Sequence, residues 1–109
     1  MRKMEKKVKV KILPQINTSM PEEVEIEIDE ESSTIPAVLS RFCKLLGMPL
    51  QRYDETLKRP VSVFWTRILV KNGEVIGRVS IDGLDVREKK DLEIKGGDEL
   101  VLFGPAEGG

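Results

Sequence analysis

The chain closes with Leu100-Val101-Leu102-Phe103-Gly104-Pro105-Ala106-Glu107-Gly108-Gly109. Its first four residues are consecutive apolar side chains, which is typical of a buried strand. The residues that follow are mostly small, and the two terminal glycines have no side chains that would keep them out of a narrow channel. The sequence therefore predicts a folded domain over residues 1–103 and a flexible tail over residues 104–109.

The carboxylate of Gly109 is the candidate reactive group of this tail. An extended residue covers about 3.3–3.6 Å, so the tail can hold this carboxylate about 20 Å beyond Phe103. An α-carboxyl has a pKa of about 3.3–3.7 in short peptides, so it is ionised at neutral pH and can attack an activated phosphate. Gly108 and Gly109 leave the last carbonyl unhindered. The alternative is an inert chain end, because small residues are common there.

Length and charge limit the class of protein. The 109 residues suffice for one domain with a modest core. Charged residues make up 34% of the chain, but the net charge is only −1, which disfavours a basic nucleic-acid binder. No apolar run approaches the roughly 18 residues of a membrane span, and no hydrophobic signal segment follows the basic residues 1–7. We therefore expect a cytoplasmic protein with neither nucleic acid nor membrane as a partner.

Histidine is absent and cysteine occurs once, as Cys43. These counts exclude or nearly exclude zinc sites, serine–histidine triads and histidine acid–base catalysis. The sequence also lacks a P-loop and a dinucleotide fingerprint. We expect that the chain binds no cofactor or metal and serves the active site of another protein, instead of catalysing a reaction alone.

Two segments near the start alternate charged and apolar residues with the period of a strand. They are residues 7–13 and 23–28, and the first would turn Val8, Val10 and Ile12 to the core. Antiparallel pairing would place three lysines, Lys7, Lys9 and Lys11, across from three glutamates, Glu23, Glu25 and Glu27. Opposite charges across strands contribute about 0.2–1 kcal/mol a pair, so we predict a hairpin.

A helix is predicted between Ser33 and Gly47. Its apolar positions form one stripe: Ile35, Val38, Leu39, Phe42, Leu45 and Leu46. Ser33 or Thr34 is expected to cap its start, Pro36 lies in the first turn, and Gly47 ends it. Cys43 lies beside the stripe and is expected to pack in the core, with a redox or acyl-carrying thiol as the alternative.

Residues 48–60 read as a polar connector with Tyr53 and Leu57 tucked underneath. Residues 61–70 have the composition of a strand, and its period breaks near Phe64-Trp65, which predicts a bulge or a change of face.

Turns and short strands are predicted for the last part of the chain. They are a turn at Asn72-Gly73, a short strand over 74–79, a turn at Gly83-Leu84-Asp85, a charged excursion over 87–91, and a tight turn at residues 95–98 that leads into the last strand.

A single helix can cover only one face of a sheet, whereas residues 100–103 are apolar on both sides. We therefore expect Val101 and Phe103, with a neighbour such as Leu69 or Trp65, to form an exposed patch for a partner. The alternative is that residues 48–60 fold over this face.

The order of two strands, a helix and further strands that end in an apolar strand and Gly-Gly is that of the ubiquitin-like β-grasp. It is an α+β fold in which a mixed sheet of four to five strands packs on one main helix. The chain resembles the MoaD/ThiS family of sulfur carriers, which includes the small subunit of molybdopterin synthase and the thiamine sulfur carrier. The similar residues are Ile68-Leu69-Val70, Asn72-Gly73-Glu74, Gly83-Leu84-Asp85, the segment from Gly97 to Phe103, and Gly108-Gly109. Two residues depart from the family pattern: Gly104 stands where a first proline is usual, and Glu107 adds a negative charge.

The resemblance implies a function for the tail. A partner activating enzyme would use ATP to adenylate the carboxylate of Gly109, which would then become a thiocarboxylate. In the molybdopterin branch, this end would enter the large synthase subunit and deliver sulfur to a pterin precursor. Gly108 and Gly109 would be the reactive end, and the partner-binding residues would be Trp65, Leu69, Val101, Phe103, Gly104, Pro105, Ala106 and Glu107.

Three alternatives stay open from the sequence. The chain could be a protein modifier that is joined to lysines of target proteins through Gly109. It could carry sulfur for thiamine or another thiolation pathway. It could also be a simple interaction module with an inert tail.

Overall fold

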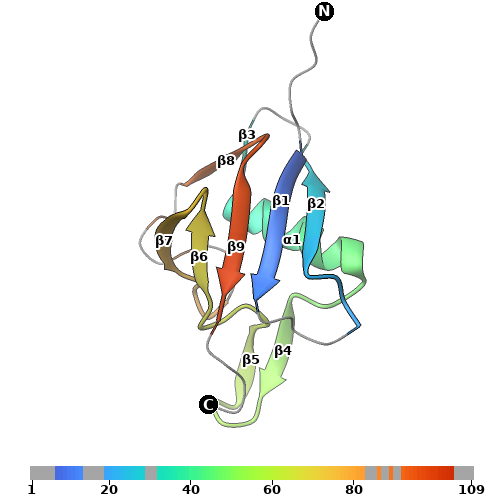
Figure 1. Ribbon diagram of the computed structural model, residues 1–109. Helices are drawn as coiled ribbons and strands as arrows, with labels where there is room; N and C mark the ends of the chain where they lie inside the picture. Colours follow the sequence, from blue (N-terminus) through green and yellow to red (C-terminus); the bar gives the residue numbers. More distant parts are fainter. Residues whose placement is uncertain are drawn as a thin grey trace, which may run out of the picture.

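A five-stranded mixed sheet and one helix form the main body of the described part of the chain (Figure 1). The structure is a computed structural model that describes residues 7–13, 19–28, 32–82, 86, 89 and 92–104. The strand order is β2-β1-β9-β6-β7, in which β1 and β9 are parallel and the other neighbours are antiparallel. Two further pairs, β3–β8 and β4–β5, form separate two-stranded sheets.

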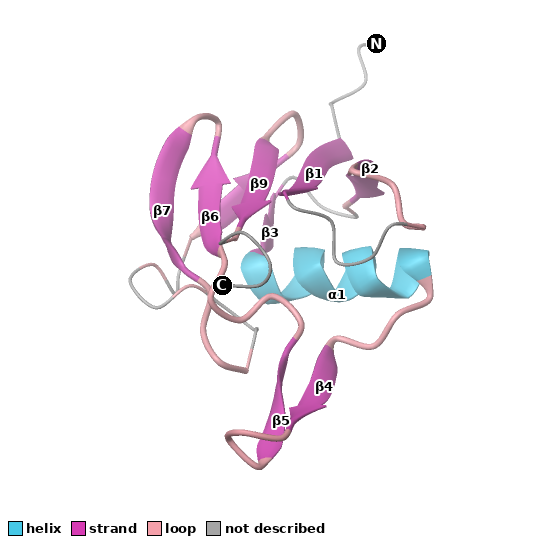
Figure 2. Ribbon diagram, turned by 60° about the horizontal axis from the view of Figure 1, so that its bottom comes forward, coloured by secondary structure: helices cyan, strands magenta, loops and turns pink. Residues whose placement is uncertain are grey.

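The elements, in chain order, are β1 (Lys7–Leu13), β2 (Glu23–Glu27), β3 (Ser32–Thr34), α1 (Ile35–Leu46), β4 (Gln51–Asp54), β5 (Arg59–Ser62), β6 (Ile68–Lys71), β7 (Glu74–Arg78), β8 (Glu93–Lys95) and β9 (Glu99–Phe103). Helix α1 lies across one face of the main sheet, and the opposite face has no helix over it among the described residues (Figures 1 and 2). The α+β class, the five-strand sheet and the one main helix agree with the sequence prediction.

The predicted hairpin of β1 and β2 is confirmed, with its register. Lys7 lies opposite Glu27, Lys9 opposite Glu25, and Lys11 opposite Glu23. The core-facing residues Val8, Val10 and Ile12 are fully buried. The charge rows face away from α1, so the alternation in the sequence separates a buried face from a solvated one.

The helix boundaries are also confirmed. The side chain of Thr34 accepts a hydrogen bond from the N–H of Ala37 at 3.3 Å, which caps the first turn. Gly47 has a φ of 68°, and its N–H donates to the carbonyl of Lys44, which ends the helix in a left-handed conformation. The predicted apolar stripe is wrong at Leu45, which is 60% exposed, because this side chain lies beside the edge strand β2, where the sheet ends.

The core lies between α1 and the covered face of the sheet. The rings of Phe42 and Phe64 meet edge to face there, with centroids 5.8 Å apart. Cys43 is buried beside Phe42, as the packing interpretation predicted, and burial raises the pKa of its thiol to about 11. A thiol with a raised pKa is a poor nucleophile at neutral pH, so the arrangement does not favour a redox or acyl-carrying role.

The prediction that residues 48–60 form a polar connector with Tyr53 and Leu57 tucked underneath is wrong. Residues 48–60 contain β4 and the first two residues of β5, and the two strands form a hairpin that projects from one end of the main sheet (Figures 1 and 2). Tyr53 and Leu57 are 59% and 40% exposed, so they are not tucked underneath. The turn is held by Asp54, whose side chain accepts from the N–H of Leu57 and whose carbonyl accepts from Lys58. The hairpin therefore leaves the open face of the sheet uncovered.

The predicted strand over 61–70 is two strands with a turn between them. β5 ends at Ser62 and β6 begins at Ile68, so the break at Phe64-Trp65 is real but larger than a bulge. The Ser62 side chain accepts from the N–H of Phe64, and its carbonyl accepts from Trp65, which closes the turn.

The later predictions agree with the structure where it describes them. Asn72 and Gly73 have φ values of 52° and 85° and join β6 to β7 in a tight turn. A turn at residues 96–97 leads from β8 to β9. The Gly83-Leu84-Asp85 turn and most of the 87–91 excursion lie outside the described residues.

Candidate functional site

Strand β9 is central in the sheet, between the parallel β1 and the antiparallel β6. Its side chains alternate between the two faces. Leu100 and Leu102 are fully buried on the side of α1. Val101 and Phe103 lie on the opposite face, where Phe103 is 53% exposed. The last strand therefore contributes to the core and to an open surface at the same time.

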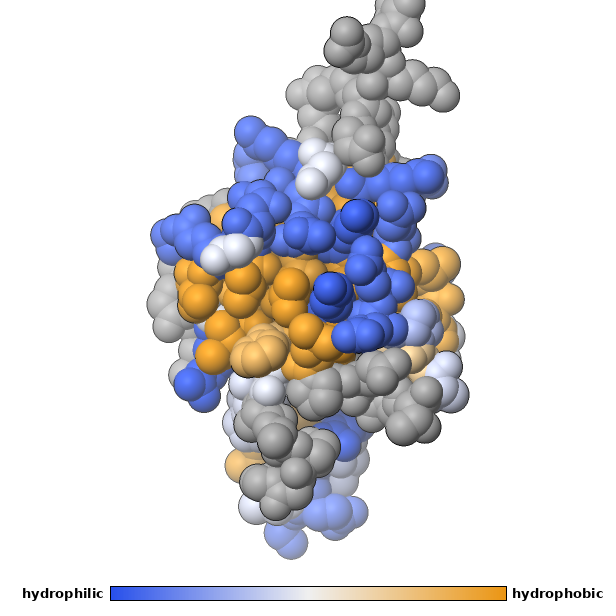
Figure 3. Space-filling model, viewed as in Figure 1, coloured by the Kyte–Doolittle hydropathy of each residue, from blue (hydrophilic) through white to orange (hydrophobic). Residues whose placement is uncertain are grey.

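The register of the strands shows which side chains join this surface. Phe103 lies between Leu13 and Ile68, and Val101 lies next to Val70. Val70 in turn lies opposite Val75 on β7, which is 67% exposed. We name this surface the open-face patch, and it consists of Leu13, Ile68, Val70, Val75, Val101 and Phe103. Figure 3 shows an apolar area over β9, β6 and β7, with charged side chains beside it.

Leu69 does not belong to the open-face patch. It lies opposite Leu102, points to the same covered face and is fully buried. The sequence predicted Leu69 for the exposed patch, but its neighbours Ile68 and Val70 lie there instead. Trp65 is half-buried in the turn before β6. Four of the patch residues were not predicted from the sequence. In an all-apolar segment such as Ile68-Leu69-Val70, the sequence does not show which side chains point to the core and which point to the open face.

Gly104 continues the sheet for one residue beyond β9. Its N–H donates to the carbonyl of Leu13 at 2.8 Å, which extends the parallel pairing with β1. A Cβ at this position would lie 3.1 Å from Cγ of Arg67, so this side chain takes the space beside Gly104. The guanidinium of Arg67 also donates to the carbonyl of Leu102 at 3.2 Å.

These contacts explain why glycine, and not proline, stands at position 104. A proline has no N–H for the carbonyl of Leu13, and its Cβ would lie 3.1 Å from Cγ of Arg67, so this side chain would have to shift. Pro105, Ala106, Glu107, Gly108 and Gly109 lie outside the described residues. The described part of the chain therefore places the root of the tail at the edge of the open-face patch.

The described residues hold no group of three or more metal-ligating side chains. No helix among them has the length and apolarity to cross a membrane. A scan against protein-family models gives no match, and searches of curated proteins and of solved structures find no significant similarity. Because these comparisons give no match, a functional proposal for this chain depends on its own residues and their geometry.

Proposed function

We propose that this chain is a ubiquitin-like β-grasp sulfur carrier of the MoaD/ThiS type, with the small subunit of molybdopterin synthase as the nearest counterpart. A five-stranded mixed sheet, a parallel central pair and one helix over one face are compatible with the β-grasp. The resemblance in the last third of the sequence supports the same assignment. In this function the chain is a carrier and co-substrate, and ATP is bound by the partner enzyme.

The observation that carries the proposal is the position of the open-face patch at the root of the tail. Phe103 is half exposed on the face that no helix of the described residues covers, and Gly104 follows it directly. Exposed apolar patches of this kind mark interaction sites in proteins. A partner that docks on Phe103 and Val101 would receive the residues that follow Gly104, so docking and delivery of the terminal carboxylate would be coupled.

The proposed chemistry takes place at the carboxylate of Gly109. A carboxylate oxygen attacks the α-phosphorus of ATP, an acyl-adenylate forms, and pyrophosphate leaves. A sulfur donor at the sulfide oxidation level then attacks the acyl carbon, AMP leaves, and a thiocarboxylate remains. Gly108 and Gly109 present no side chain that would obstruct either attack. No side chain of the described residues takes part in a bond change.

The direct test is the intact mass of the full chain after incubation with its activating enzyme, ATP and a sulfide donor. We expect an increase equal to the exchange of one oxygen for sulfur, located on Gly109 by fragmentation. Deletion of Gly109 should abolish the exchange, whereas Glu107→Ala, a change in the same tail, should retain it. Unchanged mass with an activating enzyme that thiolates another carrier in parallel would refute the proposal.

The same incubation separates the proposal from protein modification. A modifier would give higher-mass conjugates on a denaturing gel when target proteins are added, and these would be lost with Gly109. A sulfur carrier for the molybdopterin branch would instead bind a pterin-synthase large subunit, and Phe103→Ala should weaken that binding at least tenfold. An inert tail would be shown by partner binding that survives removal of residues 104–109.

A further inference from the structure

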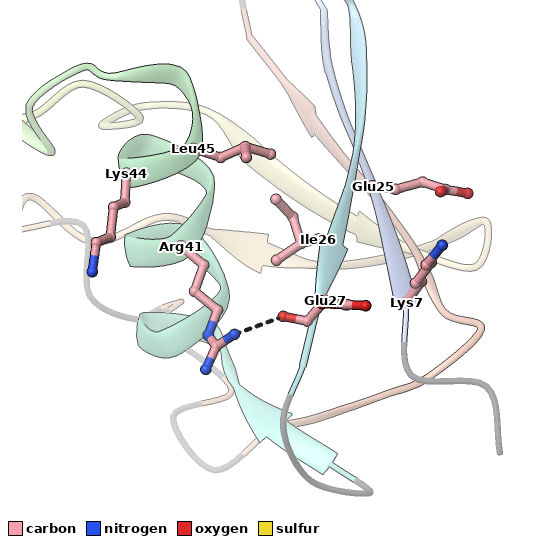
Figure 4. A pocket seen from close by; sticks show the side chains of 7 residues that line it. All are labelled: Lys7, Glu25, Ile26, Glu27, Arg41, Lys44 and Leu45. Atoms are coloured by element: carbon pink, nitrogen blue, oxygen red, sulfur yellow. Dashed lines mark hydrogen bonds between the residues drawn. The ribbon is translucent and has the colours of Figure 1, made fainter. Parts of the chain in front are cut away.

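Strand β2 is an edge strand of the main sheet, paired on one side with β1. An unpaired edge presents backbone N–H and C=O groups that can bind another strand. On its helix side, β2 is separated from α1 by a groove of about 460 Å³. Figure 4 shows this groove, which is lined by residues of both elements. None of its lining residues belongs to β9 or to the open-face patch, so the role proposed for it does not depend on the proposed sulfur chemistry.

The pairing of β1 with β2 identifies the backbone groups that point out of the sheet. The N–H of Ile12 donates to the carbonyl of Glu22 at 3.0 Å. In an antiparallel pair, hydrogen-bonded residues alternate with non-bonded ones, so Val24 and Ile26 also bond to β1. The N–H and C=O of Glu23 and Glu25 therefore point to the open edge. The carbonyl of Glu27 points the same way and accepts from Arg41 at 2.9 Å, so Arg41 closes one end of the edge.

The helix wall of the groove combines an exposed apolar side chain with two cations. Leu45 is 60% exposed and points toward Ile26 of β2 (Figure 4). Arg41 and Lys44 lie on the same wall. An incoming strand would turn alternate side chains to this wall. Apolar side chains would cover Leu45, whereas cationic ones would be repelled.

The opposite face of β2 carries a row of negative charge. Lys9 and Lys11 both approach the carboxylate of Glu23, at 4.0 and 3.9 Å. Glu25 and Glu27 are exposed, point away from α1 (Figure 4), and have no ion-pair partner among the described residues. An incoming strand would place its other side chains beside these two carboxylates. Cations there would be attracted, and anions would be repelled.

We propose that this edge binds an extended segment of a partner protein in which lysine or arginine alternates with apolar residues. The segment would add a sixth strand beside β2, its cations next to Glu25 and Glu27 and its apolar side chains over Leu45. The same alternation occurs in β1, which β2 already binds on its other side. A second copy of this chain fits less well, because two β2 edges would bring their glutamate rows together.

The test uses two short peptides with blocked ends and the full chain. One peptide alternates lysine and valine, and the other has glutamate in place of each lysine. At an ionic strength of about 20 mM, where screening is weak, the lysine peptide should shift the backbone amide resonances of Glu23, Glu25 and Glu27. The glutamate peptide should bind at least tenfold more weakly, since its carboxylates would face those of β2.

Variants on the two sheet edges sharpen the test. Glu25→Lys should weaken binding of the lysine peptide about fivefold and strengthen that of the glutamate peptide. Glu74→Lys makes the same charge change on the other edge strand, β7, and should leave both affinities unchanged. Glu25→Pro removes an outward N–H without removing a bond to β1, so it should weaken both peptides while the fold is retained.

Three results would overturn the proposal. The first is equal binding of the two peptides, and the second is binding that shifts residues of β7 and not of β2. The third is a concentration-dependent shift of the Glu23–Glu27 amides in the free protein together with a dimer in sedimentation, which would identify a second copy as the occupant.

Discussion

The two faces of β9 differ in their surroundings although their residues alternate along one strand. Leu100 and Leu102 are fully buried under α1, whereas Phe103 is half exposed on the open face. Because burial of apolar surface stabilises a fold by about 25 cal/mol per Å², the covered face contributes most of the stability. Side chains of the open face remain available to a partner. A substitution on each face should therefore separate folding from binding.

The largest expected effect is on the covered face, with Leu102→Ala. Removal of a fully buried leucine side chain leaves a cavity and should lower the free energy of unfolding by about 2–5 kcal/mol. Urea unfolding followed by circular dichroism measures this. A loss below about 1 kcal/mol would mean that the covered face is not the tightly packed side.

Cys43 tests whether the covered face excludes water. Its thiol has a pKa raised to about 11 by burial, above the value of 9.0 expected in the unfolded chain. Between these two pH values the unfolded chain loses the proton and the folded one keeps it, so stability falls as pH rises. The loss should reach about 2–3 kcal/mol near pH 11.

Cys43→Ala provides the control for this pH dependence. Lysines titrate in the same range and will weaken both proteins, so the difference between the two unfolding free energies reports the thiol alone. That difference should be constant below pH 9 and should change between pH 9 and pH 11. A constant difference across the whole range would mean that water reaches Cys43 in the folded state.

The turn at Asn72 tests the register that assigns side chains to each face. The Asn72 side chain donates to Asp98 at 3.0 Å and accepts from the N–H of Glu99 at 2.9 Å, which fixes β6 against β9. It also adopts a φ of 52°. Asn72→Ala should lower the unfolding free energy by about 2 kcal/mol, from two lost hydrogen bonds and backbone strain. Asn72→Gly should lose less in urea unfolding, since glycine accepts this φ; an equal loss would contradict the strain argument.

The sequence predicted the elements whose signals are local. The Lys–Glu alternation of β1 and β2 and the caps at Thr34 and Gly47 are each readable within a few residues. The β4–β5 hairpin was missed because its residues are mostly polar and exposed, and its two buried residues, Val61 and Ser62, are neighbours and do not alternate with exposed ones. Its exposed Tyr53 belongs to a two-stranded sheet that is separate from the main sheet.

The residues of the candidate site depend on how strands that are far apart in the sequence pair with one another. Val101 and Phe103 were assigned to one face because they alternate with buried leucines, and the strand register agrees. Leu69 could be placed only by its pairing with Leu102, which joins residues far apart in the sequence. Leu45 was misplaced because helical spacing describes the helix but not the width of the sheet beneath it.

Position 104 tests how the open face joins the tail. Gly104→Pro removes the N–H that donates to Leu13 and forces Arg67 to move, so it should cost about 1–2 kcal/mol of unfolding free energy. Gly104→Ala retains the N–H and needs only a small shift of the flexible Arg67 side chain, so it should stay within about 0.5 kcal/mol of the original chain. Urea unfolding of both variants checks this, and equal losses would contradict a specific role of the hydrogen bond.

The smallest expected effect on folding is on the open face, with Phe103→Ala. Since 53% of this side chain is exposed, its removal should cost less than about 1 kcal/mol in urea unfolding, well below the loss for its buried neighbour Leu102. Under the proposed function, in which the open face docks the activating enzyme, the same variant should lower the rate of sulfur loading onto Gly109 at limiting enzyme. Equal destabilisation by the two substitutions, with unchanged loading, would remove the distinction between the faces of β9, because both would then act only through the fold.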